Sequence, residues 1–401
     1  MEKASPMAQN QYRISRSIRE KFKVIPLTSK DIARLTNVGL DHFSFLKQVS
    51  SITFSVYFRV NMELLEYITP ENFSHELVDK IIAARNKEYQ NLDICVRTVD
   101  FAKFQNLIDT IRRKKMETLL EKDPHLDRKT MLVFADLSGA SQMIVRGGIS
   151  AAVAQQAKKS AGRLIDNLMD SHVAIGTLSR MVLADSTLYD HSASVAMLAG
   201  IISKNLMGLS RDDAERCARG GLYHDVGKTC VPQSVLNKPS KLTPEEFDIM
   251  KTHTTLGYDE LIKAIEGGAP IEADVALVSL EHHEKFLGGG YPQGRSGRRE
   301  DHVDGISLYA RVVTIADVYS ALLMKRVYKD AFDQKQTLEI MRGVSKDYDP
   351  SIWTKFEKSV DRSTAHFTEL DSRPPPQKSP GRIFIMDKEG LRPLNSIKKS
   401  S

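Results

Sequence analysis

Successive helical patterns fill residues 190–343, and they constrain the fold more than any other feature of the sequence. At least five such patterns follow one another there, separated by turn signals. In DHSASVAMLAGIISKNLMGL, for example, Val195, Leu198 and Ile202 fall on one helical face. Helices joined by short turns predict a mainly α bundle for this part of the chain.

Residues that can bind metal ions recur along these helices. Five of the eleven histidines lie between positions 191 and 283, and two aspartates share their inward-facing environment. Each of these residues alone is compatible with an ordinary core histidine or a tethering aspartate. Together they would be costly to bury without partners, and metal ions would satisfy all of them. The seven residues are His191, His224, Asp225, His253, His282, His283 and Asp317.

The size of this set indicates more than one metal ion. Five imidazoles and two carboxylates exceed the three or four protein ligands of a mononuclear catalytic zinc site. They suit two divalent ions, with one aspartate bridging and positions left open for water and substrate. The set contains no thiolate, which favours Fe, Mn, Zn or Ni over copper(I) or an iron–sulfur cluster.

The order His191, His224–Asp225 and Asp317 resembles the HD superfamily of metal-dependent phosphohydrolases. A longer series of motifs over roughly 187–350 resembles the HD-GYP family, bacterial phosphodiesterases that hydrolyse cyclic di-GMP. The motifs are HDVGK, VLNKPSKLTPEEFDIMKTH, EHHEKFLGGGYPQG and ARVVTIADVYSALLMKRVYK. The resemblance implies a helical HD-GYP domain that opens the cyclic dinucleotide to linear pGpG, with further hydrolysis to GMP left open.

The resemblance also implies a role for each site residue. All seven residues would bind two metal ions, with Fe or Mn preferred to Zn or Ni and Asp225 as the bridging ligand. Asp225 and Lys228 are the catalytic candidates, because a metal-activated hydroxide attacks in line and an ammonium can meet the phosphate. The substrate contacts would be Lys228, Gly290, Tyr291, Arg326 and Lys329.

The chain departs from the family pattern beside these motifs. Phe286 and Leu287 stand where the family commonly has an acidic residue and a tryptophan, and Ser320 stands where it commonly has Asp. These changes support a first alternative, a weak or inactive cyclic di-GMP receptor that signals through protein partners. A second alternative keeps hydrolysis but changes the substrate to another cyclic dinucleotide or nucleotide.

The rest of the chain divides into simpler segments. Strands are predicted at 53–60 and 92–96, helices at 69–87 and 99–120, and a strand or buried connector at 131–136. The helical stretch that follows is expected to break near Gly176. The expected organisation is a lead-in (1–22), a small α/β regulatory module (23–140), connecting helices (141–186), the HD-GYP domain (187–360) and a Pro-rich, basic tail (361–401).

Composition and charge narrow the partners. The longest apolar run, at 194–202, is too short to cross a membrane, and the N-terminus has no apolar secretory core, so a cytoplasmic protein is expected. Three isolated cysteines (Cys95, Cys217 and Cys230) argue against a disulfide framework. The net charge of +6 is spread along the chain, so nucleic acid is not an expected partner. The expected partners are cyclic di-GMP, a signalling protein and a second copy of the chain, docked through the connecting helices.

Overall fold

The computed structural model divides the chain into two compact units, residues 1–112 and 113–401. The boundary falls inside helix α5 (Phe101–Lys122). The predicted fold class is confirmed, because the chain is mainly helical with a small N-terminal α/β module. The structure describes residues 22–32, 34–38, 43–60, 62–87, 93–184, 190–236, 238, 240–297, 305–324, 332–372, 384–387 and 390–393.

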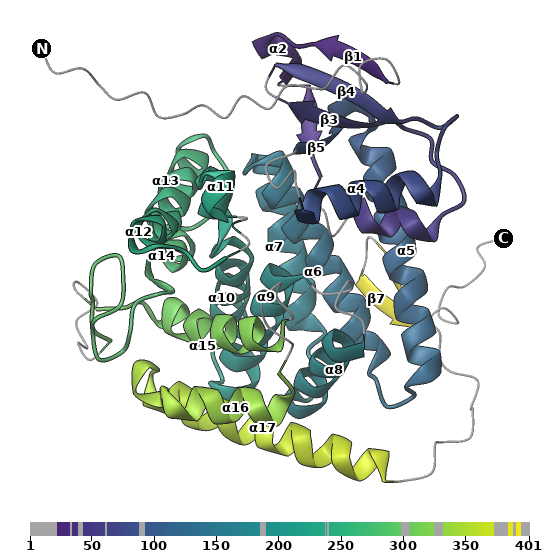
Figure 1. Cartoon of the computed structure of the whole chain (residues 1–401). Coiled ribbons are helices and arrows are strands. Elements are labelled where there is room, and N and C mark those ends of the chain that lie inside the picture. Colours follow the sequence, from purple (N-terminus) through teal and green to yellow (C-terminus); the bar gives the residue numbers. More distant parts are fainter. Residues whose placement is uncertain are drawn as a thin grey trace, which may run out of the picture. The chain divides into compact units, whose positions relative to one another are not determined.

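The first unit is a five-stranded antiparallel sheet in the order β1-β4-β3-β5-β2, packed against helices on one face (Figure 1). Side-chain alternation along β3 explains this arrangement, since Val56 and Phe58 point into a core that also contains Val78 and Phe104. Tyr57, between them, points to the opposite face. The elements of this unit are β1 (Lys23–Pro26), α2 (Ser29–Ile32), β2 (Leu35–Asn37), η1 (Phe45–Gln48), β3 (Val56–Val60), β4 (Glu63–Ile68), α4 (His75–Lys87), β5 (Asp93–Arg97) and η2 (Thr98–Asp100).

The second unit is a bundle of helices around one large apolar core. Helix α9 is buried along its length from Ala193 to Ile201, and α10 and α15 pack against it (Figure 1). The helices are α6 (Arg128–Gly147), α7 (Ala151–Asp166), α8 (Ser171–Ala184), α9 (His191–Ile201), the π-helical η4 (Ile202–Leu206), α10 (Arg211–Tyr223), η5 (Val226–Cys230), α11 (Gln233–Leu236), α12 (Pro244–Lys251), α13 (His253–Glu266), α14 (Ala273–Glu281), α15 (Leu308–Leu323), α16 (Gln334–Gly343), η6 (Ser345–Asp347) and α17 (Pro350–Asp371).

Two predictions for the first helices of the second unit are wrong. Residues 131–136 form neither a strand nor a connector but part of α6, which Asp127 caps by accepting a hydrogen bond from Thr130 N at 2.6 Å. The expected break near Gly176 falls at 167–170 instead, between α7 and α8. Gly176 lies inside α8, where a Cβ atom would come within 2.0 Å of the Phe367 ring. This glycine therefore permits close packing of α17 and does not end a helix.

The C-terminal segment is more structured than the sequence predicts. Helix α17 continues past residue 360 to Asp371 and buries Phe367. A short antiparallel hairpin follows, formed by β6 (Phe384–Asp387) and β7 (Gly390–Pro393). The Pro-rich stretch at 373–382 lies outside the described residues. Among the helices that the structure describes, none is both long enough and apolar enough to cross a membrane.

Candidate metal centre

The structure brings all seven predicted metal ligands together in the helical unit. Their ligand atoms form three overlapping groups, each with its atoms within 4.8 Å of one another. The groups are His253–His282–His283, His191–His224–Asp225 and His224–His282–Asp317. The ligands come from the start of α9, the end of α10, the start of α13, the end of α14 and the middle of α15. Helices from distant parts of the sequence therefore meet at one point.

Asp225 lies at the middle of this cluster. Its Oδ2 atom is 3.2 Å from His224 Nε2, and its Oδ1 atom is 3.4 Å from His253 Nε2 and 3.8 Å from His282 Nε2. Asp317 is the second carboxylate, with Oδ1 3.0 Å from His191 Nε2. Asp225 thus faces histidines on both sides.

The histidines are oriented by hydrogen bonds on their outer nitrogens. His224 Nδ1 donates to Gly221 O at 2.8 Å, and His253 Nδ1 donates to Met250 O at 2.7 Å. His282 Nδ1 lies 3.0 Å from Ser279 O. A carbonyl oxygen can only accept, so each Nδ1 carries a proton, and each ring turns its Nε2 toward the aspartates. This is the arrangement in which imidazole binds a metal ion.

The electrostatics of the cluster favour neutral rings at His253, His282 and His283 beside ionised carboxylates. Burial lowers the pKa of His253, lowers that of His282 further, and lowers that of His283 to about 4. Burial alone would raise the pKa of Asp225, but His224 and Lys228 outweigh it and hold that pKa well below its usual range.

For His224 burial opposes the charged ring, yet the charges of Asp225 and Asp317 raise its pKa overall. For Asp317 burial opposes ionisation, and the contact with His191 outweighs it and lowers the pKa. The cluster therefore combines imidazole nitrogens with two ionised carboxylates in a buried environment.

Several acceptor atoms of the cluster face one another, and a cation between them would remove their mutual repulsion. His253 Nε2 and His282 Nε2 lie 3.4 Å apart, and in the neutral rings both are acceptors. Within the described part of the chain, His224 Nε2 and Asp225 Oδ1 are buried without a hydrogen-bond partner, although Asp225 Oδ2 is 3.2 Å from that nitrogen. Facing acceptors repel unless a positive charge lies between them. The residues present thus suit divalent metal ions.

The adjacent histidines His282 and His283 both belong to the cluster. In the structure their rings are neighbours, with centroids 4.1 Å apart and planes inclined by 42°. Helix α14 ends at Glu281, so the two residues are not on a regular helix and both can turn toward His253. Only His282 also belongs to the group with His224 and Asp317.

Three of the five predicted substrate-contact residues lie in the described part of the chain. Lys228 Nζ lies 2.5 Å from Asp225 Oδ2, and Tyr291 stacks on His283 with ring centroids 4.7 Å apart. Gly290 passes so close to the preceding chain that a Cβ atom would lie 2.5 Å from His283 O. These three residues therefore border the cluster. Arg326 and Lys329 lie outside the described residues.

Two buried carboxylates, which the sequence analysis did not single out, hold the glycine-rich loop. Glu284 Oε1 accepts a hydrogen bond from Gln293 N at 2.7 Å. Glu281 accepts from Arg295 Nη1 at 2.5 Å and from Ser307 N at 2.9 Å. Burial raises the pKa of Glu284, and backbone N–H groups of the loop oppose that shift. The available signal was the position of both acids beside a loop rich in backbone donors.

Close backbone packing explains why the HDVGK motif has a glycine at position 227. A Cβ atom on Gly227 would lie 2.0 Å from His253 O and 2.4 Å from Gly257 N. Helix η5 can therefore lie directly against the first turn of α13. This contact brings His224 and Asp225 close to His253.

The three departures from the family pattern have different environments. Ser320 Oγ lies 2.9 Å from His191 Nδ1, so this serine orients a predicted ligand. Phe286 packs beside Gly297, where a Cβ atom would meet its ring at 2.4 Å. Leu287 remains 45% exposed. None of the three is among the seven residues of the cluster.

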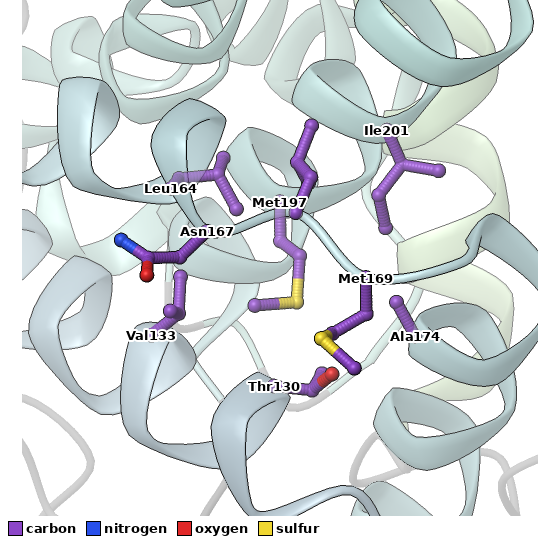
Figure 2. Close-up of a pocket in the computed structure, with 9 residues that line it drawn as sticks. Thr130, Val133, Leu164, Asn167, Met169, Ala174, Met197 and Ile201 are labelled. Atoms are coloured by element: carbon purple, nitrogen blue, oxygen red, sulfur yellow. The ribbon is translucent and has the colours of Figure 1, made fainter. Parts of the chain in front are cut away.

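A small hollow elsewhere in the helical unit lacks the features of an active site (Figure 2). Its walls come from α6–α9 and the loop between α7 and α8, and they are mostly apolar. The polar contributions are Thr130 and Asn167, and none of the seven cluster residues lines it. Its lining contains no charged side chain, so it offers no ionic partner for a phosphate.

Comparisons with known proteins agree with this location. Residues 177–352 match the family model of the HD domain. The cyclic di-GMP phosphodiesterase response regulator RpfG of Xanthomonas campestris is 38% identical over 168 residues, which cover 40% of this chain and 41% of that protein. A cyclic di-GMP phosphodiesterase of Thermotoga maritima is 33% identical over 180 residues, 44% of this chain and 46% of that protein.

A relative named for a different substrate also matches. The 3'3'-cGAMP-specific phosphodiesterase 2 of Vibrio cholerae is 34% identical over 149 residues, 37% of this chain and 27% of that protein. The chain spans less than half the length of each of these three relatives. The matches therefore describe the domain that carries the cluster.

Proposed function

Because residues 177–352 of this chain form an HD domain of the HD-GYP family, we propose that the chain hydrolyses cyclic di-GMP to linear pGpG at its histidine–aspartate cluster. One observation carries the proposal: five imidazoles and two carboxylates converge in overlapping groups within 4.8 Å. Relatives named as cyclic di-GMP phosphodiesterases support the choice of substrate. Hydrolysis of pGpG to GMP is a further step open to the same site.

Two divalent metal ions, iron or manganese before zinc or nickel, complete the proposed site. Such ions lower the pKa of a water and offset the negative charge on the phosphoryl oxygens. The protein's part is to hold neutral rings in place, which the hydrogen bonds of His224, His253 and His282 to backbone carbonyls achieve. The proposed ligands are His191, His224, Asp225, His253, His282, His283 and Asp317.

Lys228 is proposed to bind the phosphate at the scissile bond. Its ammonium lies 2.5 Å from Asp225 and its side chain is 35% exposed, so it borders both the cluster and solvent. An ammonium in that position can form charge-assisted hydrogen bonds with a phosphoryl oxygen. Lys228 would then orient the phosphate and balance its charge, while Asp225 stays ionised.

The glycine-rich loop is proposed to position the nucleotide. Burial raises the pKa of Tyr291, so the phenol stays protonated and can donate a hydrogen bond. Gly290 leaves room for the backbone to come close to a bulky anion. Arg326 and Lys329 are proposed to bind the second phosphate, by family resemblance alone.

The α/β module and the partners complete the proposal. The module would regulate the HD-GYP domain or dock it to a signalling protein. A homodimer through the connecting helices stays part of the proposal, but the α7 alanines Ala154, Ala157 and Ala161 are buried in the chain's own core. A homodimer would therefore need another surface of the connecting helices.

Two alternatives have specific support. The relative that is specific for 3'3'-cGAMP favours hydrolysis of a different cyclic dinucleotide. The substitutions at Phe286 and Leu287 favour a receptor that binds cyclic di-GMP without turnover. Ser320, the third departure, supports the enzyme instead, because it holds His191.

One assay separates these readings. The full chain is purified anaerobically with Mn²⁺ or Fe²⁺, and nucleotide products are followed with cyclic di-GMP and 3'3'-cGAMP as substrates. We expect pGpG from the wild type and none from Asp225→Asn, while Asp212→Asn, an exposed carboxylate on α10, should match the wild type. Tight binding of cyclic di-GMP without products in the metal-loaded protein would establish the receptor. Products from 3'3'-cGAMP alone would establish the other substrate.

A further inference from the structure

An exposed aromatic ring outside the hydrophobic cores contacts Tyr291, which borders the histidine–aspartate cluster. Phe247 on α12 is 47% exposed, and its ring meets Tyr291 edge to face, with centroids 6.3 Å apart and planes at 78°. Tyr291 in turn stacks on His283. A line of three rings therefore runs from the cluster to the surface, and Phe247 is its outermost member.

Helix α12 holds this ring in a defined place although it buries none of its residues completely. A capping box between Thr243 and Glu246 fixes its first turn, and Lys238 pairs with Glu246. Phe247 follows directly after this anchored turn. Single exposed apolar residues are common at protein surfaces, and what distinguishes Phe247 is its contact with Tyr291, which stacks on His283 of the cluster.

A flexible cation accompanies the ring. Lys251 follows Phe247 by one helical turn, and its Nζ atom lies 5.4 Å from the centre of the ring. Lys251 also pairs with Asp248 at 2.7 Å. Both contacts are exposed and weak, whereas a nucleobase stacks on an aromatic ring more strongly. A base can therefore take the ring face while the long lysine side chain moves to the edge of the base.

We propose that Phe247 and Lys251 form a base subsite that receives one guanine of the cyclic dinucleotide. The inference rests on the proposed function and adds the residues that select the base. Guanine presents two acceptors, O6 and N7, to a lysine, whereas adenine presents a donor at N6 in place of O6. Phe247 supplies stacking, which accepts any base, and Lys251 supplies the preference for guanine.

The stacking role is tested with Phe247→Ala in the metal-loaded full chain. The readouts are KM for cyclic di-GMP hydrolysis and Kd by titration calorimetry, so the subsite is tested even in a chain that binds without turnover. We expect KM or Kd to rise at least about fivefold with kcat unchanged, because stacking contributes equally before and during the reaction. Phe247→Trp should restore the wild-type value, and Ile249→Ala, an exposed apolar residue of the same helix, should leave it unchanged.

The guanine preference is tested with Lys251→Met against Lys263→Met. Both lysines pair with an acid three residues earlier, and Lys263 lies on the next helix, α13. Lys251→Met should weaken cyclic di-GMP binding severalfold and leave inhibition by cyclic di-AMP unchanged. Equal weakening for both dinucleotides would show a phosphate contact and overturn the guanine assignment.

The two proposals fail in different ways. A wild-type chain that hydrolyses or binds cyclic di-GMP, together with an unchanged constant for Phe247→Ala, overturns the base subsite alone. A metal-loaded wild type that binds no cyclic dinucleotide overturns both proposals.

Discussion

Ser320 Oγ lies 2.9 Å from Nδ1 of His191, and the Nε2 atom of the same ring lies 3.0 Å from Asp317. The serine therefore fixes the orientation of a predicted metal ligand from behind. Partners of this kind typically change metal affinity about 10- to 100-fold when they are removed. Ser320, which stands where the family commonly has Asp, therefore still supplies a hydrogen-bond partner for His191.

Removal of the Ser320 hydroxyl should weaken metal binding. Ser320→Ala should lower Mn²⁺ affinity at least about 10-fold in a competition titration with a chelator, because His191 loses its orienting contact. Ser194→Ala is the matched control, since Ser194 is fully buried on α9 and its hydroxyl has no hydrogen-bond partner among the described residues. Equal affinity in the two variants would show that Ser320 does not orient the ligand.

Loss of the Glu284 carboxylate should loosen the glycine-rich loop. Glu284→Ala leaves Gln293 N without its acceptor and should cost about 1–3 kcal/mol of stability, with a lower kcat/KM for cyclic di-GMP. Hydrogen exchange over residues 285–295 should become faster, which checks the structural cause directly. Lys285→Ala removes an ion pair whose lysine is about half exposed, and it should change stability by no more than about 1 kcal/mol.

The local hydrophobic pattern of the sequence predicted the helices of residues 190–343 and the inward direction of the candidate ligands. The features that it missed depend on capping and on contacts between distant parts of the chain. His253, for example, was expected to face inward, and it is buried. The helix 131–136 was missed because its apolar run has no clear period, and the deciding signal was the cap at Asp127. Gly176 resembled a helix end, but its reason is a contact with Phe367, which lies far along the chain.

The same contrast between local pattern and long-range contacts explains which site residues could be predicted. Seven candidate ligands could be named from the sequence because metal chemistry restricts the residue types, whatever their separation along the chain. Glu281 and Glu284 could not be named, because an acid beside histidines is as easily a solvated residue. Only the folded loop shows that these acids accept hydrogen bonds from Ser307 and Gln293.

Arg219 should be a main source of stability for the helices that carry the ligands. Its guanidinium is completely buried and pairs with Glu215 at 2.6 Å and with Glu272 at 2.6 Å, which ties α10 to the start of α14. Arg219→Met leaves a buried carboxylate unpaired and should cost about 3–5 kcal/mol in urea unfolding.

Arg211→Met on the same helix is the control for this prediction. Arg211 pairs with Asp166 at 2.7 Å, but both side chains are more than half exposed, so the expected cost is below about 1 kcal/mol. Addition of Glu215→Gln to Arg219→Met should recover part of the loss. Similar costs for the two arginine variants would contradict the role assigned to burial.

Gly227 should tolerate no side chain. Gly227→Ala would place a Cβ atom 2.0 Å from His253 O, which is backbone and cannot rotate away. We expect a loss of about 1–3 kcal/mol or more, and weaker metal binding as η5 moves away from α13. Gly139→Ala, in open space on α6, should instead stabilise the chain by about 0.5–1 kcal/mol. Thermal unfolding of the two variants gives shifts of opposite sign if the contact matters.

Acid should destabilise the metal-free protein through His283. Burial lowers the pKa of His283 to about 4, whereas the unfolded chain protonates this residue near about 6.5. The unfolded state therefore binds more protons between these two values, so stability is full above pH 6.5 and falls as the pH drops to 4. The loss from this one ring should be about 3 kcal/mol. His283→Asn removes it, so the wild-type advantage in urea unfolding at pH 7 should shrink by that amount at pH 4; an advantage independent of pH would show that the ring titrates alike in both states.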